Sequence, residues 1–149
     1  MKKTTTWVLV ADGGRARILH NDGPGRGLLP VAGHHYETEL PPDRELRSDR
    51  PGRTFESADS SRHGISPPTD YHRLEKERFI ERLAGIVDDA ARTGEYDRLV
   101  IVAPPQALGV LRQALGKHAS AKLAGELNKD LTDQNPEQVA SRLGDILAV

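Results

Sequence analysis

The sequence predicts an α/β protein with a single mixed β-sheet and helices packed on it, and two features of its apolar pattern carry this prediction. The first 37 residues hold three runs rich in β-branched and apolar residues, separated by glycine-containing turns, which is typical of an antiparallel meander. After a long polar segment, helical apolar spacing alternates with short apolar strands. Strands joined through a helix pair in parallel, so we expect the order β-β-β-loop-α-β-α-β-α in one domain of 149 residues.

Three strands are expected in the first part of the chain. The first covers about Thr5 to Ala11, and its nearly continuous apolar run predicts burial on both faces. Asp12 and the two glycines after it are typical of a tight turn. The elements expected next are a strand at Ala16–His20, a turn at Asn21–Gly27 and a strand at Leu28–Glu37 that is irregular at Pro30 and Gly33.

A long helix is expected between Thr69 and Gly94. Thr69 or Asp70 is suited to cap its start, and Gly94 is suited to end it. Helical spacing predicts an inward face that holds Leu74, Phe79, Ile80, Leu83, Ile86, Val87 and Ala90.

The last third of the chain continues the alternation of strands and helices. A buried strand is expected at Asp97–Pro104 and a weaker one at about Leu123–Leu127. Asn135 followed by Pro136 predicts the start of the final helix. The apolar residues expected to face inward are Leu108, Leu111 and Leu115 in a helix over Pro104–His118, and Val139, Leu143, Ile146 and Leu147 in the final helix.

Composition limits the function. The net charge of −1 gives no general attraction to polyanions, and the absence of cysteine rules out disulfides and thiolate chemistry. The apolar run Trp7–Ala11 is too short for a signal-peptide core, and no segment approaches the roughly 20 apolar residues that span a bilayer. We therefore expect a cytoplasmic protein without a membrane partner, and nothing in the sequence indicates a cofactor or a small-molecule substrate.

The polar segment at about residues 40–69 contains a row of arginines. Four of them recur every three residues, and in an extended chain this spacing lines them along one side, as a phosphate backbone would require. Acidic residues balance the arginines one for one over residues 43–64, so a solvated charged loop is the alternative. The candidate partner-binding residues here and at the start of the long helix are Arg44, Arg47, Arg50, Arg53, Arg62, His63 and Arg73.

Asp12 is the candidate for acid chemistry, because it directly follows the first strand. Asp130, beyond the last strand, is a possible second carboxylate for a metal-dependent nuclease, which needs several carboxylates at one site. The alternative is that Asp12 is a turn residue before two glycines. The adjacent His34 and His35 point to opposite faces of a strand and are poorly placed to share a metal. No serine lies in a nucleophile elbow, and the glycines do not form a phosphate-binding loop.

Four blocks of the sequence together resemble one family over essentially the whole chain. They read WVLVADGGRARIL, SRHGISPPTDYHRLEKERF, DRLVIVAPPQALGVLRQAL and ELNKDLTDQNPEQVASRL, in this order. They are similar to the bacterial host attachment proteins, also called proteins required for attachment to host cells. This resemblance implies a binding or adaptor role with an unknown protein partner, and it implies no ligand or catalytic residue.

The host attachment family in turn resembles the middle domain of archaeal and eukaryotic class 1 peptide release factors. That domain carries a Gly-Gly-Gln motif in its long loop, whereas the tandem glycines here, Gly13 and Gly14, lie in the first hairpin and precede Arg15. No catalytic residue is therefore carried over. We expect a non-enzymatic binding protein that works through the 40–69 loop, and the alternative is a translation-associated protein that binds the ribosome or tRNA.

Overall fold

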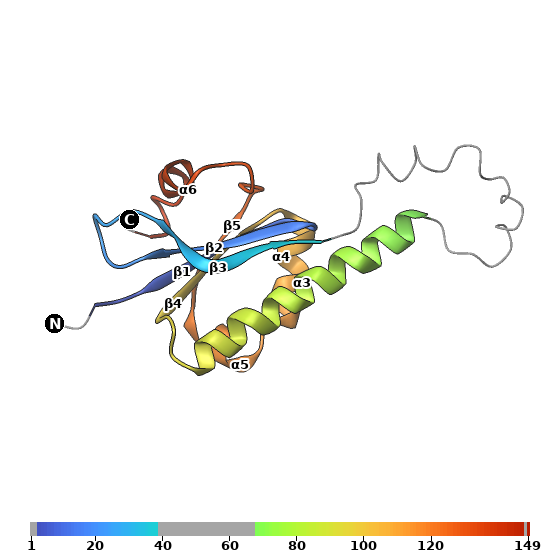
Figure 1. Ribbon diagram of the computed structural model, residues 1–149, viewed down its shortest axis with the longest axis horizontal. Helices are drawn as coiled ribbons and strands as arrows, with labels where there is room; N and C mark the ends of the chain where they lie inside the picture. Colours follow the sequence, from blue (N-terminus) through green and yellow to red (C-terminus); the bar gives the residue numbers. More distant parts are fainter. Residues whose placement is uncertain (1–2, 39–67, 148) are drawn as a thin grey trace, which may run out of the picture.

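The computed structural model describes residues 3–38, 68–147 and 149 and contains a single five-stranded mixed sheet in the order β3-β2-β1-β4-β5 (Figure 1). β1 pairs antiparallel with β2 and parallel with β4, β2 pairs antiparallel with β3, and β4 pairs parallel with β5. The predicted α/β fold with a mixed sheet is therefore confirmed. The strands are β1 Thr6–Ala11, β2 Arg15–Asn21, β3 Leu29–Glu37, β4 Arg98–Ala103 and β5 Leu123–Asn128.

Helices cover both faces of this sheet (Figure 1). On one face, Trp7 and Leu9 of β1 pack in a core with α3, α4 and α5. On the other face, Val8 and Val10 pack in a second core with α6. Because side chains alternate along a strand, all six residues of β1 are buried, as its apolar run predicts. The helices are α3 Pro68–Arg92, α4 Pro105–Ala114, α5 Lys117–Lys122 and α6 Pro136–Arg142.

Several local expectations from glycine and asparagine are confirmed. Gly33 has a φ of 83° in β3, where the pairing with β2 also shifts register, and Gly94 has a φ of 77° just beyond α3. Asn135 caps α6, because its side chain accepts a hydrogen bond from the Gln138 amide at 2.8 Å and the Gln138 side chain bonds back to the Asn135 amide. Within the described residues, no helix is both long and apolar enough to cross a membrane.

The predicted single helix at Pro104–His118 is wrong, because the chain forms two helices there. The break lies at Gly116, where an extended backbone with φ −77° and ψ 178° precedes α5. Asp88 of α3 explains the break, since its Oδ1 accepts a hydrogen bond from the Ala119 amide at 2.8 Å. A Cβ at Gly116 would lie 2.5 Å from the Asp88 carboxyl group. The glycine therefore lets Asp88 reach and cap α5 from a different helix.

Replacing Gly116 with alanine is expected to lower the free energy of unfolding by about 1–3 kcal/mol, because the added methyl group must displace Asp88 from the start of α5. Urea denaturation measures this change. Gly109 within α4 is the matched control, since a Cβ there meets nothing within 4 Å. Gly109→Ala is expected to raise stability by about 0.5–1 kcal/mol. Equal effects of the two substitutions would contradict the role given to Asp88.

The ends of two helices also differ from the expectation. α3 begins at Pro68, so Thr69 and Asp70 lie inside the helix and do not precede it. Leu74, expected to face the core, is 46% exposed, because the first turns of α3 extend beyond the sheet (Figure 1). α6 ends at Arg142, earlier than predicted. Leu143 and Leu147 nevertheless remain buried in the second core.

Candidate functional site

The residues with candidate chemistry gather at one edge of the sheet. β1, β4 and β5 run parallel, so their carboxyl ends meet at the same edge. Asp12 follows β1, Pro104 follows β4, and Asp130 lies two residues beyond β5. In open α/β sheets, ligands bind in the crevice outside the carboxyl ends of the strands. This edge carries two features, a polar cluster at Asp12 and a cleft between α3 and α4.

Asp12 holds the tight turn between β1 and β2. Its Oδ1 accepts hydrogen bonds from the amides of Gly14 and Arg15, both at 2.7 Å, while its own amide donates to the Arg15 carbonyl at 2.9 Å. This arrangement is an Asx-turn, in which the aspartate side chain accepts hydrogen bonds from nearby backbone amides. One carboxylate oxygen of Asp12 is therefore engaged in maintaining the hairpin.

Thr132 brings Asp130 to the other oxygen of Asp12. The Thr132 hydroxyl lies 3.2 Å from Asp12 Oδ2 and 2.6 Å from Asp130 Oδ1, and its single proton is donated to one carboxylate at a time. Arg15 donates to the same hydroxyl at 3.0 Å and pairs with Asp133 at 3.0 Å. The hydrogen bond to Asp133 is the main reason that the pKa of Arg15 is raised, and the charge of Asp12 adds to it.

Arg17 joins the same polar cluster from β2. Its Nη2 donates to the carbonyl oxygens of Leu131 and Gln134. Burial, followed by the nearby charge of Arg15, lowers the pKa of Arg17. Together, Arg15 and Arg17 tie the turn between β5 and α6 to the β1–β2 hairpin.

Asp12 and Asp130 thus approach each other, as the nuclease hypothesis requires, but their hydrogen bonds serve the local fold. Across residues 3–38, 68–147 and 149, no group of three or more histidine, cysteine or acidic side chains is placed to hold a metal ion. The turn interpretation of Asp12 fits this geometry, because its carboxylate binds two backbone amides and a threonine hydroxyl.

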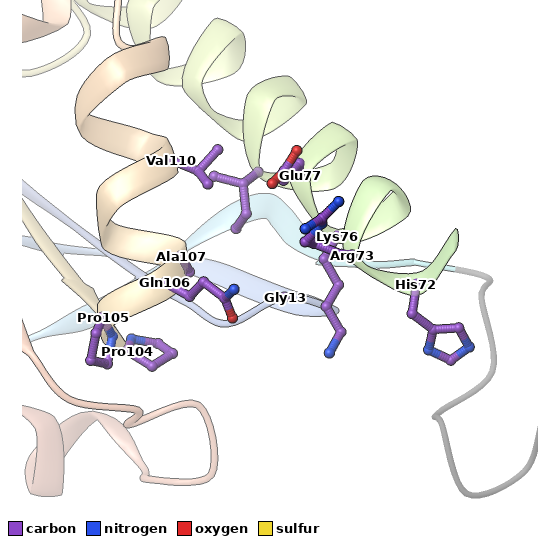
Figure 2. Close-up of a pocket in the computed structure, with 11 residues that line it drawn as sticks. Gly13, His72, Arg73, Lys76, Glu77, Pro104, Pro105, Gln106, Ala107 and Val110 are labelled. Atoms are coloured by element: carbon purple, nitrogen blue, oxygen red, sulfur yellow. The ribbon is translucent and has the colours of Figure 1, made fainter. Parts of the chain in front are cut away.

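A cleft of about 520 Å³ opens on the α3 side of the hairpin (Figure 2). The first turns of α3 form one wall, the segment from Pro104 to Val110 forms the other, and Gly13 lies between them. Its apolar lining comprises Ile80, Pro104, Pro105, Ala107 and Val110, and its polar lining includes Arg73, Lys76, Glu77 and Gln106. The cleft is thus an apolar hollow with charged groups along the α3 side.

The Lys76 stem lies against the hairpin at Gly13. A Cβ at Gly13 would lie 2.9 Å from Lys76 Cδ, so the absence of a side chain at Gly13 lets the lysine stem lie against the turn. In Figure 2, Lys76 extends past Gly13, whereas Glu77 lies farther from Gly13. Arg73 and Lys76 are both exposed, and neither forms an ion pair within the described part of the chain.

The start of α4 adds positive potential to the opposite wall. Leu108 is the first residue of α4 to donate a backbone hydrogen bond to an earlier carbonyl, that of Pro104. The amides of Gln106 and Ala107 therefore lie before the helical ladder begins. The first turn of α4 contains no acidic residue, and Pro104 provides no side-chain cap. The helix dipole at this end favours a negative charge.

The sequence-based candidates divide into three groups. Arg73 lies on the cleft, and Asp12 and Asp130 meet through Thr132. Sequence reasoning did not single out Lys76, and it missed the cleft residues Gly13 and Gln106. Their position after two adjacent parallel strands is the signal that could have found them. The candidates that lie outside the described residues are Arg44, Arg47, Arg50, Arg53, Arg62 and His63.

The fold and the site define an α/β protein with a cleft at the carboxyl edge of a mixed sheet. The chain belongs to the family described as "Protein required for attachment to host cells", whose model matches residues 7–143. The family resemblance seen in the sequence blocks is therefore confirmed. A comparison with curated proteins gave no match.

Two similar solved structures are of archaeal proteins. The crystal structure of the archaeal translation termination factor aRF1 is 10% identical, with a TM-score of 0.47, and the match covers 95% of this chain and 39% of that one. A second structure, described as an archaeal protein, is 11% identical with a TM-score of 0.44, and covers 95% and 38%. The expected similarity to a release factor is thus present at low identity, and the chain spans about two fifths of both structures.

Proposed function

We propose that this protein is a non-enzymatic binding protein that holds an RNA phosphate backbone, in the ribosome or in a tRNA, at the base of α3. The observation that carries the proposal is the pair Arg73 and Lys76, which are exposed on the cleft without an ion pair in the described part of the chain. Phosphate oxygens are the groups that such cations bind in nucleic acids.

The segment that leads into α3 supports the same partner. It contributes the arginine row at Arg44, Arg47, Arg50 and Arg53, and it joins α3 at Pro68, close in sequence to Arg73. A run of cations along an RNA strand binds through many weak contacts that add together. Since the net charge of the chain is −1, the binding depends on this local group of cations.

The proposal contains no chemical step, because Asp12 is engaged by the hairpin and by Thr132. It places the protein in the cytoplasm, where ribosomes and tRNA occur. An influence on attachment, which the family description names, would then be an indirect consequence of RNA binding inside the cell. The alternative is that this face binds a protein and not RNA.

Purified protein is expected to co-sediment with ribosomes at low salt and to dissociate at high salt, because phosphate contacts release counterions. Two variants are expected to lose most of this binding, R44A/R47A/R50A/R53A and R73A/K76A. The matched control is Arg92→Ala at the other end of α3, where the arginine pairs with Asp89 at 3.6 Å. Binding that ignores salt, or that both variants retain, would contradict RNA binding and favour a protein partner.

A further inference from the structure

We infer that the cleft between α3 and α4 binds a small organic phosphate with the size and chemistry of a nucleoside monophosphate. The inference goes beyond RNA binding at the exposed face, because it concerns one compact ligand that enters the cleft beside Arg73 and Lys76. Its volume of about 520 Å³ falls within the range of small-molecule pockets, roughly 300–1,000 Å³. A mononucleotide fills such a space, whereas an inorganic ion leaves its apolar walls in contact with water.

The cationic end of the cleft suits a phosphate group. Arg73 and Lys76 lie on one wall without an ion pair in the described part of the chain, and the amides that open α4 lie on the facing wall. A phosphate monoester carries about −1.5 to −2 charges near pH 7, so the positive charges on this wall attract it. Because Gly13 has no Cβ, the Lys76 stem can lie against the hairpin on this wall.

The rest of the cleft suits a flat, mostly apolar body with polar edges. Pro104, Pro105 and Val110 provide accessible apolar surface beside the buried Ile80 and Ala107, and apolar surface excludes water from the faces of a ring. Glu77 lies farther from Gly13 than Lys76 does in Figure 2. Its carboxylate accepts hydrogen bonds, and the Gln106 amide both accepts and donates. An acid at this end would repel a second phosphate, so one phosphate and one ring form the favoured ligand.

The test is a titration of isotopically labelled protein with adenosine 5′-monophosphate, followed by nuclear magnetic resonance. Amide signals of Gly13, Lys76, Gln106 and Ala107 are expected to shift together, with a dissociation constant of about 10–1,000 µM. Adenosine and inorganic phosphate, the two halves of the probe, are expected to bind at least about tenfold more weakly. No shift at millimolar probe, or shifts confined to another part of the protein, would overturn the inference.

Three variants distinguish binding in the cleft from a general attraction of the phosphate to the positive charges of α3. Lys76→Ala is expected to weaken binding of the monophosphate at least about tenfold, because a charge-assisted contact is lost. Gln106→Trp keeps every charge and is expected to block the cleft, since Gln106 is exposed at its mouth. Arg78 pairs with Glu75 at 2.8 Å and does not line the cleft, so Arg78→Ala is expected to bind normally. Normal binding by Gln106→Trp would overturn the inference.

The nucleoside monophosphate that the cleft binds can be a free mononucleotide or the end of an RNA chain, and a short single-stranded RNA distinguishes the two. If the cleft takes the end of an RNA chain, the oligonucleotide shifts the same amides and the monophosphate competes with it. If the ligand is a free mononucleotide, the oligonucleotide leaves Gln106 and Ala107 unshifted while the monophosphate still binds. The second result would support the cleft site even if ribosome co-sedimentation failed, so the two proposals can fail separately.

Discussion

Replacing Leu83 with alanine is expected to lower the free energy of unfolding by about 2–5 kcal/mol. Leu83 is 1% exposed and packs in the core between α3 and the sheet. The lost methyl groups would leave a cavity that the surrounding helices cannot fully close. Chemical denaturation measures the loss. An unchanged slope of the free energy of unfolding against denaturant concentration shows that both proteins expose the same surface when they unfold.

Leu74→Ala is the matched control for this substitution. Leu74 occupies the same helix, and the same atoms are removed, but its side chain is 46% exposed. We expect a change within about 0.5 kcal/mol, as at most surface positions. A loss at Leu74 equal to that at Leu83 would mean that the first turns of α3 are packed against other residues.

Leu74 also shows what apolar spacing predicts and what it omits. The period of α3 identified the buried residues Phe79, Ile80, Leu83 and Val87, because a helix on a sheet buries one continuous stripe. The period carries no information about where the supporting sheet ends, so it placed Leu74 inside as well. Gly116 illustrates the same limit, since its role depends on Asp88, which is distant in sequence and adjacent in space.

Replacing both Arg73 and Lys76 with glutamate is expected to weaken RNA binding about a hundredfold at 0.15 M salt. Two contacts to phosphate are removed, and two repulsive charges take their place. Fluorescence anisotropy with a labelled single-stranded RNA measures the affinity. Arg92→Glu at the other end of α3 reverses a single charge far from the cleft, and its effect is expected to be severalfold at most.

The candidate site could be predicted from sequence only in part. Asp12 and Arg73 were identified because a turn signal and a run of charges are local in the sequence. The cleft itself forms where α3 and α4 lie beside Gly13. These three segments are distant in the sequence, so no local sequence pattern predicts the cleft. Lys76 looked like an ordinary solvated residue, since the missing ion pair and its contact with Gly13 appear only in three dimensions.

The salt dependence of RNA affinity tests the central claim most directly, because it counts the phosphate contacts. For single strands, the slope of log affinity against log salt changes by about 0.7 for each contact. The R73A/K76A variant is therefore expected to show a slope smaller in magnitude by about 1.4 than the unsubstituted protein. Equal slopes for the two proteins would contradict the placement of RNA phosphates at Arg73 and Lys76.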